Sequence, residues 1–100
     1  MVNIGIVVYN IVQYEELIDF FTDYLHCSPH CKSHIYCEWR LPLMHIMIIG
    51  NVSHARGCRF DLIYYDNRIP QVDIDNILYQ CSYYQTKPRP LYDFLLRLRS

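Results

Sequence analysis

Residues 2–25 read VNIGIVVYNIVQYEELIDFFTDYL, and this stretch decides the fold that the sequence predicts. Its first part, Val2–Tyr9, is a nearly continuous run of apolar and β-branched residues, which is typical of a strand buried on both faces in a parallel sheet. From Tyr14 the apolar residues recur at the i, i+3, i+4, i+7 spacing of an amphipathic helix, which Pro29 ends. The residues expected on the buried face of this helix are Tyr14, Leu17, Ile18, Phe21, Tyr24 and Leu25.

The rest of the chain adds three strands and two short helices to this beginning. The alternation of apolar and polar residues over Ile35–Leu41 predicts a strand with one face exposed to water. Two apolar runs, Leu43–Ile49 and Leu62–Tyr65, predict buried strands. Short helices are expected from Asp73, which we take as an N-cap residue, and over Leu91–Arg99.

The order β-α-β-β-β-α-α predicts the α/β class, a small single domain with a mainly parallel or mixed β-sheet flanked by helices. With 100 residues, of which 52% are hydrophobic and 19% charged, the composition is that of one globular domain over residues 1–100. We expect residues 82–100 to form a C-terminal connection and a short helix within this domain.

The charged residues are unevenly placed along the chain. A formal net charge of −1 argues against a general affinity for nucleic acid through phosphate neutralisation. The first helix has an acidic face, early enough to suit the helix dipole, and the C-terminal end is basic. We expect both to be solvated faces, and the alternative is complementary patches for self-association or a partner. The residues concerned are Glu15, Glu16, Asp19 and Asp23 in the helix, and Lys87, Arg89, Arg97 and Arg99 at the end.

The N-terminal stretch lacks the basic region of a signal peptide, and no segment approaches the roughly 18 uninterrupted apolar residues of a membrane span. Five cysteines, an odd number, indicate free thiols or metal ligation in a reducing compartment. We therefore expect a protein of the cytoplasm, the host cytoplasm if the protein is viral, with no membrane partner.

Residues 26–37 read HCSPHCKSHIYC and concentrate histidine and cysteine. Tetrahedral Zn²⁺ takes thiolate and imidazole ligands, so the stretch contains a candidate metal site. The alternative is that Cys37 packs inward from a strand as a small hydrophobe, while the histidines lie on an exposed loop. We expect no cofactor, with zinc as the alternative. The candidate metal ligands are Cys27, Cys31, His34 and Cys37.

The same stretch suggests a Cys–His nucleophile, because Cys27 and Cys31 have histidines close by in the sequence. Neighbours in sequence rarely give the geometry that a nucleophile and its base need, and the chain shows no turn suited to an oxyanion hole. The sequence therefore predicts no catalytic residue.

The segment HIMIIGNVSHARGCRFDLIYYDN, residues 45–67, combines an apolar strand, a loop with Ala-Arg-Gly and a hydrophobic strand that ends in Asp66. It resembles the region around the Walker B strand in the ATPase core of phage terminase large subunits and related helicase-like P-loop proteins. Residues 4–25, IGIVVYNIVQYEELIDFFTDYL, are similar in form to the strand and helix between the two nucleotide motifs of that family. The resemblance covers residues 1 to about 80.

The resemblance implies that Asp66 binds a cofactor, as the aspartate that helps to hold Mg²⁺ in that family. Asn67 stands where the family has its catalytic glutamate, and the sequence contains no G-x-x-x-x-G-K-[ST] loop to cradle phosphates. The alternative for Asp66 is a strand-end carboxylate that caps a turn with Asn67. The resemblance thus implies a scaffold that has lost its catalytic parts and kept a binding role.

From these features the sequence predicts a small non-enzymatic binding protein, encoded by a virus or phage, that inhibits or regulates a host factor through protein–protein contacts and forms a homo-oligomer. One alternative is a zinc-stabilised nucleic-acid-binding or regulatory module, because residues 83–92, YYQTKPRPLY, interleave basic and aromatic side chains. Another is a residual nucleotide-binding enzyme. The candidate partner-binding residues are Arg56, Arg59, Lys87 and Arg89.

Overall fold

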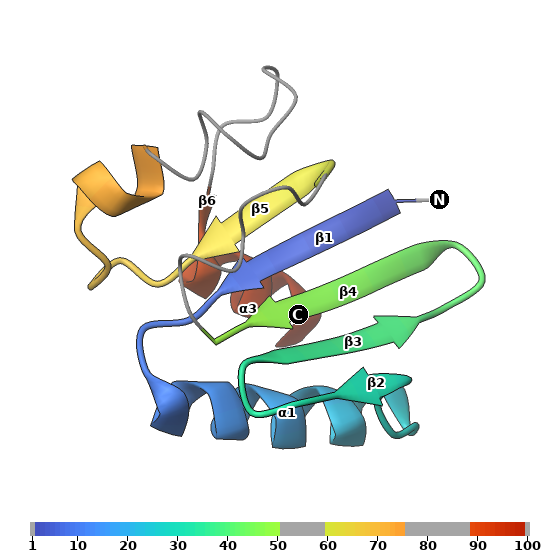
Figure 1. Ribbon diagram of the computed structural model, residues 1–100. Helices are drawn as coiled ribbons and strands as arrows, with labels where there is room; N and C mark the ends of the chain where they lie inside the picture. Colours follow the sequence, from blue (N-terminus) through green and yellow to red (C-terminus); the bar gives the residue numbers. More distant parts are fainter. Residues whose placement is uncertain (1, 51–59, 76–88, 100) are drawn as a thin grey trace.

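The structure is a computed structural model that describes residues 2–50, 60–75 and 89–99. Within these residues, six strands form one sheet in the order β2-β3-β4-β1-β5-β6, and helices flank it (Figure 1). The predicted α/β class with a mixed sheet is therefore confirmed. The elements are β1 (Val2–Val7), α1 (Ile11–Leu25), β2 (Cys31–Lys32), β3 (Tyr36–Arg40), β4 (Met44–Ile49), β5 (Leu62–Tyr65), β6 (Arg89–Pro90) and α3 (Leu91–Arg99), with a further helical stretch at residues 71–75.

β1 lies in the middle of the sheet, and its neighbours on both sides, β4 and β5, are parallel to it. Beyond them, β6 is parallel to β5, whereas β3 and β2 continue the other side in antiparallel pairing. A central parallel strand is covered on both faces, which explains why apolar residues follow one another in β1 without alternation. Ile6 and Val7 show this directly, because both are buried but belong to hydrophobic cores on opposite faces.

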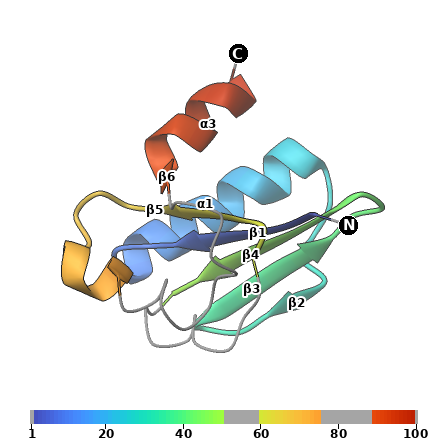
Figure 2. The same ribbon diagram turned by 90° about the horizontal axis from the view of Figure 1, so that it is seen from above.

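Helices α1 and α3 cover the same face of the sheet (Figure 2). The buried face of α1 packs on β1, β3 and β4, and the ring of Phe94 in α3 lies 6.1 Å from that of Phe21 and 4.4 Å from that of Tyr64. The only tryptophan of the chain, Trp39, is buried in the same core, with its ring 5.7 Å from that of Phe21. The α1 residues buried in this core are Tyr14, Leu17, Ile18 and Phe21.

The opposite face of the sheet is covered by shorter segments that flank β5. Phe60, just before β5, packs directly over Gly5 of β1, so that a Cβ atom at Gly5 would lie 2.7 Å from the Phe60 ring. After β5, Ile69 and Ile74 join the same core together with Met47 and Ile49 of β4. Glycine in the middle of a strand is thus explained by the close approach of an aromatic ring.

Several predicted details differ from the structure. α1 begins at Ile11 instead of Tyr14, so its carboxylates start beyond the first turn, and Tyr24 is exposed. Asp73 is not an N-cap residue, because it lies inside the helical stretch 71–75 and its backbone N–H donates to the carbonyl of Pro70. The two-residue strands β2 and β6 were not predicted, since so short a segment carries no periodicity.

Candidate functional site

The strands β1, β5 and β6 are parallel to one another, so they end at the same edge of the sheet. The chain leaves this edge in two directions: after β1 it enters α1 on one face, and after β5 it enters the segment of Ile69 and Ile74 on the other face. A crevice at such a switch point is the usual ligand site of open α/β sheets. We call this region the carboxyl edge and define it as residues 9–13, 66–72 and 90–95.

A carboxylate lies at the centre of the carboxyl edge. Asp66 directly follows β5 and is almost completely buried. Its Oδ1 accepts the backbone N–H of Arg68 at 2.8 Å and the Arg68 Nε–H at 2.9 Å. Its Oδ2 accepts from Arg68 Nη2 at 3.1 Å and from Gln13 Nε2 at 2.5 Å. Asp66 therefore caps the turn after β5 and at the same time connects that turn to the start of α1.

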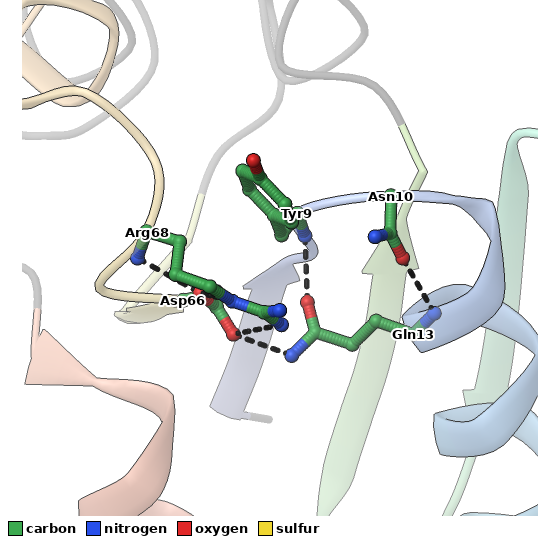
Figure 3. Close-up of polar contacts among 5 residues, drawn as sticks. All are labelled: Tyr9, Asn10, Gln13, Asp66 and Arg68. Carbon is green, nitrogen blue, oxygen red and sulfur yellow. Dashed lines mark hydrogen bonds and ion pairs between the residues drawn. The ribbon is translucent and has the colours of Figure 1, made fainter.

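Gln13 extends this network to the end of β1 (Figure 3). Its Oε1 accepts the backbone N–H of Tyr9 at 2.6 Å, and its own backbone N–H donates to the Asn10 side chain at 2.9 Å. Asn10 and Gln13 thus form a variant of the capping box, in which the N3 side chain reaches back to the residue before the N-cap. The Arg68 guanidinium lies over the Tyr9 ring, 4.5 Å from its centroid, in a cation–π contact.

The electrostatics of this network hold Asp66 in its ionised form. Hydrogen bonds from the Arg68 side chain, supported by the Arg68 backbone and by Gln13, outweigh burial and lower the pKa of Asp66 to about 2. A carboxyl group with so low a pKa is a weak base and is not protonated at neutral pH, so it is poorly matched to general acid or base chemistry. Its chemistry suits the positioning of neighbouring groups.

A pocket of about 270 Å³ opens at the carboxyl edge between the start of α1, the turn after β5 and the start of α3. One side of the pocket is polar and is formed by Gln13, Asp66 and Asn67. The other side is mainly apolar and comes from β6 and α3. Its residues are Pro90, Leu91, Tyr92 and Leu95.

Exposed apolar side chains also belong to the carboxyl edge. Within the described residues, five of the large hydrophobic residues that are exposed to solvent belong to the carboxyl edge, and Tyr92, at 69% exposure, also lines the pocket. They come from three segments that are distant in sequence and that the sheet brings to one edge. These residues are Tyr9, Ile11, Val12, Val72 and Tyr92.

Two of the binding residues predicted from the sequence, Asp66 and Arg89, lie within the described residues. Asp66 lies at the centre of the network, and Arg89 lies exposed in β6 next to the pocket residue Pro90. Arg56, Arg59 and Lys87 lie outside the described residues. The partner-binding role of the four basic residues stays a prediction, as does the cofactor-binding role of Asp66.

The candidate zinc ligands lie on different parts of the β2–β3 region. Cys27, Cys31 and His34 are exposed, whereas Cys37 is completely buried in the core beneath α1. Cys31 pairs with Glu38 and Lys32 with Cys37, so the two cysteines of this strand pair project to opposite faces. The inward packing of Cys37 is confirmed, and burial raises the pKa of its thiol to about 11. Over residues 2–50, 60–75 and 89–99, no three His, Cys, Asp or Glu side chains are grouped to hold a metal ion; the zinc site stays a prediction.

A second polar cluster lies on β3 and β4, on the face that was expected to be wet. Glu38 is 5% exposed and accepts hydrogen bonds from Tyr36 Oη at 2.7 Å and from His45 Nε2 at 2.5 Å, and Arg40 Nη2 lies 3.1 Å from it. Burial disfavours the charge of Glu38, but these hydrogen bonds and charges outweigh burial and lower its pKa. The alternation in the sequence correctly predicted the face of the strand to which the Glu38 side chain points, but it wrongly predicted that this side chain is exposed to water.

Sequence reasoning missed Gln13, Arg68 and Tyr9 as members of the network around Asp66. One signal was available, because Asn10 and Gln13 have the spacing of a capping box.

Neither α1 nor any other helix in the described part of the chain combines the length and apolar character that crossing a bilayer requires. Comparison with protein-family models, with curated proteins and with solved structures finds no match to this chain.

Proposed function

We propose that this protein is a small binding protein that acts through contacts with another protein, and that the carboxyl edge is its binding surface. The observation that carries the proposal is the group of exposed apolar residues at the carboxyl edge, with Tyr9, Ile11 and Val12 from one segment and the pocket residue Tyr92 from another. Protein interfaces are enriched in tyrosine and arginine, and both occur here in the stacked pair of Tyr9 and Arg68.

The state of Asp66 favours binding over catalysis at this edge. Each of its oxygens accepts two hydrogen bonds, which fills the acceptor sites of a carboxylate. The group therefore fixes the relative position of α1 and the turn after β5, and with it the arrangement of the apolar residues that they carry. Such preorganisation lowers the entropy that a binding surface loses when a partner docks.

The biological setting that we propose is that of the sequence prediction: an accessory protein of a virus or phage that inhibits or regulates a host factor in the cytoplasm, and that forms a homo-oligomer. The odd number of cysteines, five, supports a reducing compartment. Light scattering after size-exclusion chromatography tests the oligomer, and a strict monomer over the accessible concentrations would contradict it. The zinc-stabilised module and the residual nucleotide-binding enzyme remain alternatives to this proposal.

The binding surface is tested by comparing two variants in which a glutamate replaces an exposed apolar residue, one at each of two opposite edges of the sheet. Tyr9→Glu introduces a charge at the carboxyl edge, whereas Leu43→Glu introduces one at a side chain that is 82% exposed just before β4 and hence at the other edge. Proteins captured from the natural host by the wild type should be lost with Tyr9→Glu and retained with Leu43→Glu. Equal capture by all three forms would contradict the proposal.

A further inference from the structure

The pocket at the carboxyl edge has a size and a lining that restrict what can enter it. Pockets for drug-sized ligands and cofactors usually measure about 300–1,000 Å³. At about 270 Å³ this pocket lies just below that range. Its size suits a single side chain of a partner better than a whole cofactor, which agrees with interfaces in which one anchor residue fills a pocket at the centre.

The charges at the pocket do not favour a charged side chain of a partner as its occupant. Asp66 is the only ionisable group among the lining residues that carries a charge at neutral pH, and its charge is balanced by Arg68 at 2.9 Å. Because the four acceptor sites of the Asp66 carboxylate are filled, a lysine or arginine of a partner finds no free oxygen there. The anchor is therefore neutral.

Two amides of the polar wall still have hydrogen-bonding capacity. Gln13 Nε2 carries two hydrogens and donates one to Asp66, so the other is available to an acceptor in the pocket. Asn67 is exposed, and its side-chain amide has no hydrogen bond to any residue in the described ranges. The pocket is also lined by the apolar side chains of Leu91 and Leu95 and the ring of Pro90, which come from β6 and α3. An occupant that fits both walls has a flat apolar body and one polar atom that both donates and accepts.

We propose that this pocket receives a tyrosine side chain of the protein partner, with the ring against Leu91 and Leu95 and the phenolic hydroxyl between the amides of Gln13 and Asn67. The inference rests on the proposed function, since it names the residue by which the partner is held at the carboxyl edge. Tyrosine satisfies the lining because its hydroxyl is both a donor and an acceptor and its ring is apolar.

The test uses the intact protein and small probes that carry only the side chain in question. N-acetyl-tyrosinamide, N-acetyl-phenylalaninamide and N-acetyl-leucinamide are titrated into the ¹⁵N-labelled protein, and the side-chain amide signals of Gln13 and Asn67 are followed by NMR. We expect the tyrosine probe to shift these signals and to bind about five- to tenfold more tightly than the phenylalanine probe, because the latter leaves the two amides unpaired. The leucine probe should cause no saturable shift.

A pair of neighbouring substitutions provides the control. Leu95→Trp fills the pocket and should abolish binding of the tyrosine probe, whereas Leu96→Trp adds the same ring at an exposed residue that does not line the pocket and should leave binding unchanged. The amide spectrum shows in each case whether the variant is folded. Equal affinity for tyrosine and leucine probes, shifts located away from Gln13 and Asn67, or equal binding by both variants would overturn the inference.

Failure of this inference can be distinguished from failure of the proposed function. If the tyrosine probe does not bind but Tyr9→Glu still abolishes partner capture, the carboxyl edge remains the binding surface and the tyrosine anchor is wrong. If the probe binds in the pocket but neither Tyr9→Glu nor Leu95→Trp affects partner capture, the pocket exists without the proposed function.

Discussion

The side chains of Gln13 and Asp66 form a hydrogen bond of 2.5 Å although the two residues are 53 positions apart in the sequence. Gln13 belongs to the first turn of α1, and Asp66 follows β5. This bond therefore joins the two connections that diverge at the switch point of the sheet. It keeps the exposed residues of both connections in one arrangement, and it makes the carboxyl edge sensitive to the ionisation of a single carboxyl group.

Replacing Asp66 with asparagine should destabilise the protein at neutral pH. The variant loses the charged acceptor for Arg68, and we expect a loss of about 1–2 kcal/mol in the free energy of unfolding, since Arg68 is half exposed and solvent screens part of the interaction. Because the pKa of Asp66 falls from 3.8 to about 2 on folding, its contribution is complete above pH 3.8 and is lost as the pH falls towards 2. Urea unfolding followed by Trp39 fluorescence measures the difference at both ends of this range.

The control for this experiment is Asp75→Asn, at an exposed carboxylate that accepts a hydrogen bond from Gln71 Nε2 four residues earlier in the same helical stretch. It should change stability by less than about 0.5 kcal/mol at neutral pH. A difference between wild type and Asp66→Asn that stays constant down to pH 2.5 would show that the Asp66 charge does not contribute as described.

Gly5→Ala should be destabilising in spite of its small size. The added methyl group would meet the Phe60 ring at 2.7 Å, which forces the ring and its neighbours to move, and overpacking of this kind costs about 1–3 kcal/mol. Gly5→Ala should cost less stability in the Phe60→Leu background than in the wild type, because the smaller side chain leaves room for the added methyl group. A double-mutant cycle by thermal unfolding measures this difference. If the two substitutions are strictly additive, Phe60 does not lie on Gly5.

Glu38 and His45 should be coupled energetically. In a double-mutant cycle with Glu38→Gln and His45→Gln, we expect the interaction to contribute about 1 kcal/mol or more, because Glu38 is buried and bonded directly to the imidazole. The pKa of Glu38 lies below 4.5 in the folded protein, so its contribution is present above that pH and is lost as the pH falls through the lowered pKa. A coupling energy near zero at neutral pH would contradict this arrangement.

The cysteines of the described residues should differ sharply in reactivity. Cys27 and Cys31 are exposed and should react with iodoacetamide in the folded protein, whereas Cys37 should react only after unfolding, because it is fully buried and the pKa of its thiol is about 11. Mass-spectrometric peptide mapping measures each site. We expect a chelator to leave these rates unchanged; faster alkylation of Cys27 and Cys31 in its presence would instead establish the zinc alternative.

The elements that the sequence predicted well are those in which one physical signal dominates. β1 was found because its apolar run reflects burial on both faces, and the buried face of α1 because Tyr14, Leu17, Ile18 and Phe21 repeat at helical spacing. The start of α1 was missed because Ile11 and Val12 prolong the apolar run of β1, although in the structure both are exposed at the carboxyl edge. Because β-branched residues favour strands, Ile11 and Val12 gave no sign of the boundary between β1 and α1.

The candidate site could be predicted only in part. Asp66 was recognisable as a carboxylate at the end of a buried strand, and capping of a turn was one of its two predicted roles. Its partner Gln13 could not be identified, since that contact depends on β5 lying next to β1, which the order of elements in the sequence does not determine. The burial of Glu38 could likewise not be predicted from the sequence, because alternation indicates to which face of the sheet a side chain points and not which other residues cover that face.

The central place of β1 has a consequence for synthesis on the ribosome. β1 is translated before both of its neighbours, yet it cannot pair until β4 and β5 have emerged, as much as 58 residues later for the pair Ile4 and Leu62. Until then its apolar residues are unprotected, and closure of such distant pairs makes folding slow. We expect refolding in milliseconds to seconds in stopped-flow experiments that follow Trp39, and a nascent chain truncated before β5 should depend on chaperones for its solubility.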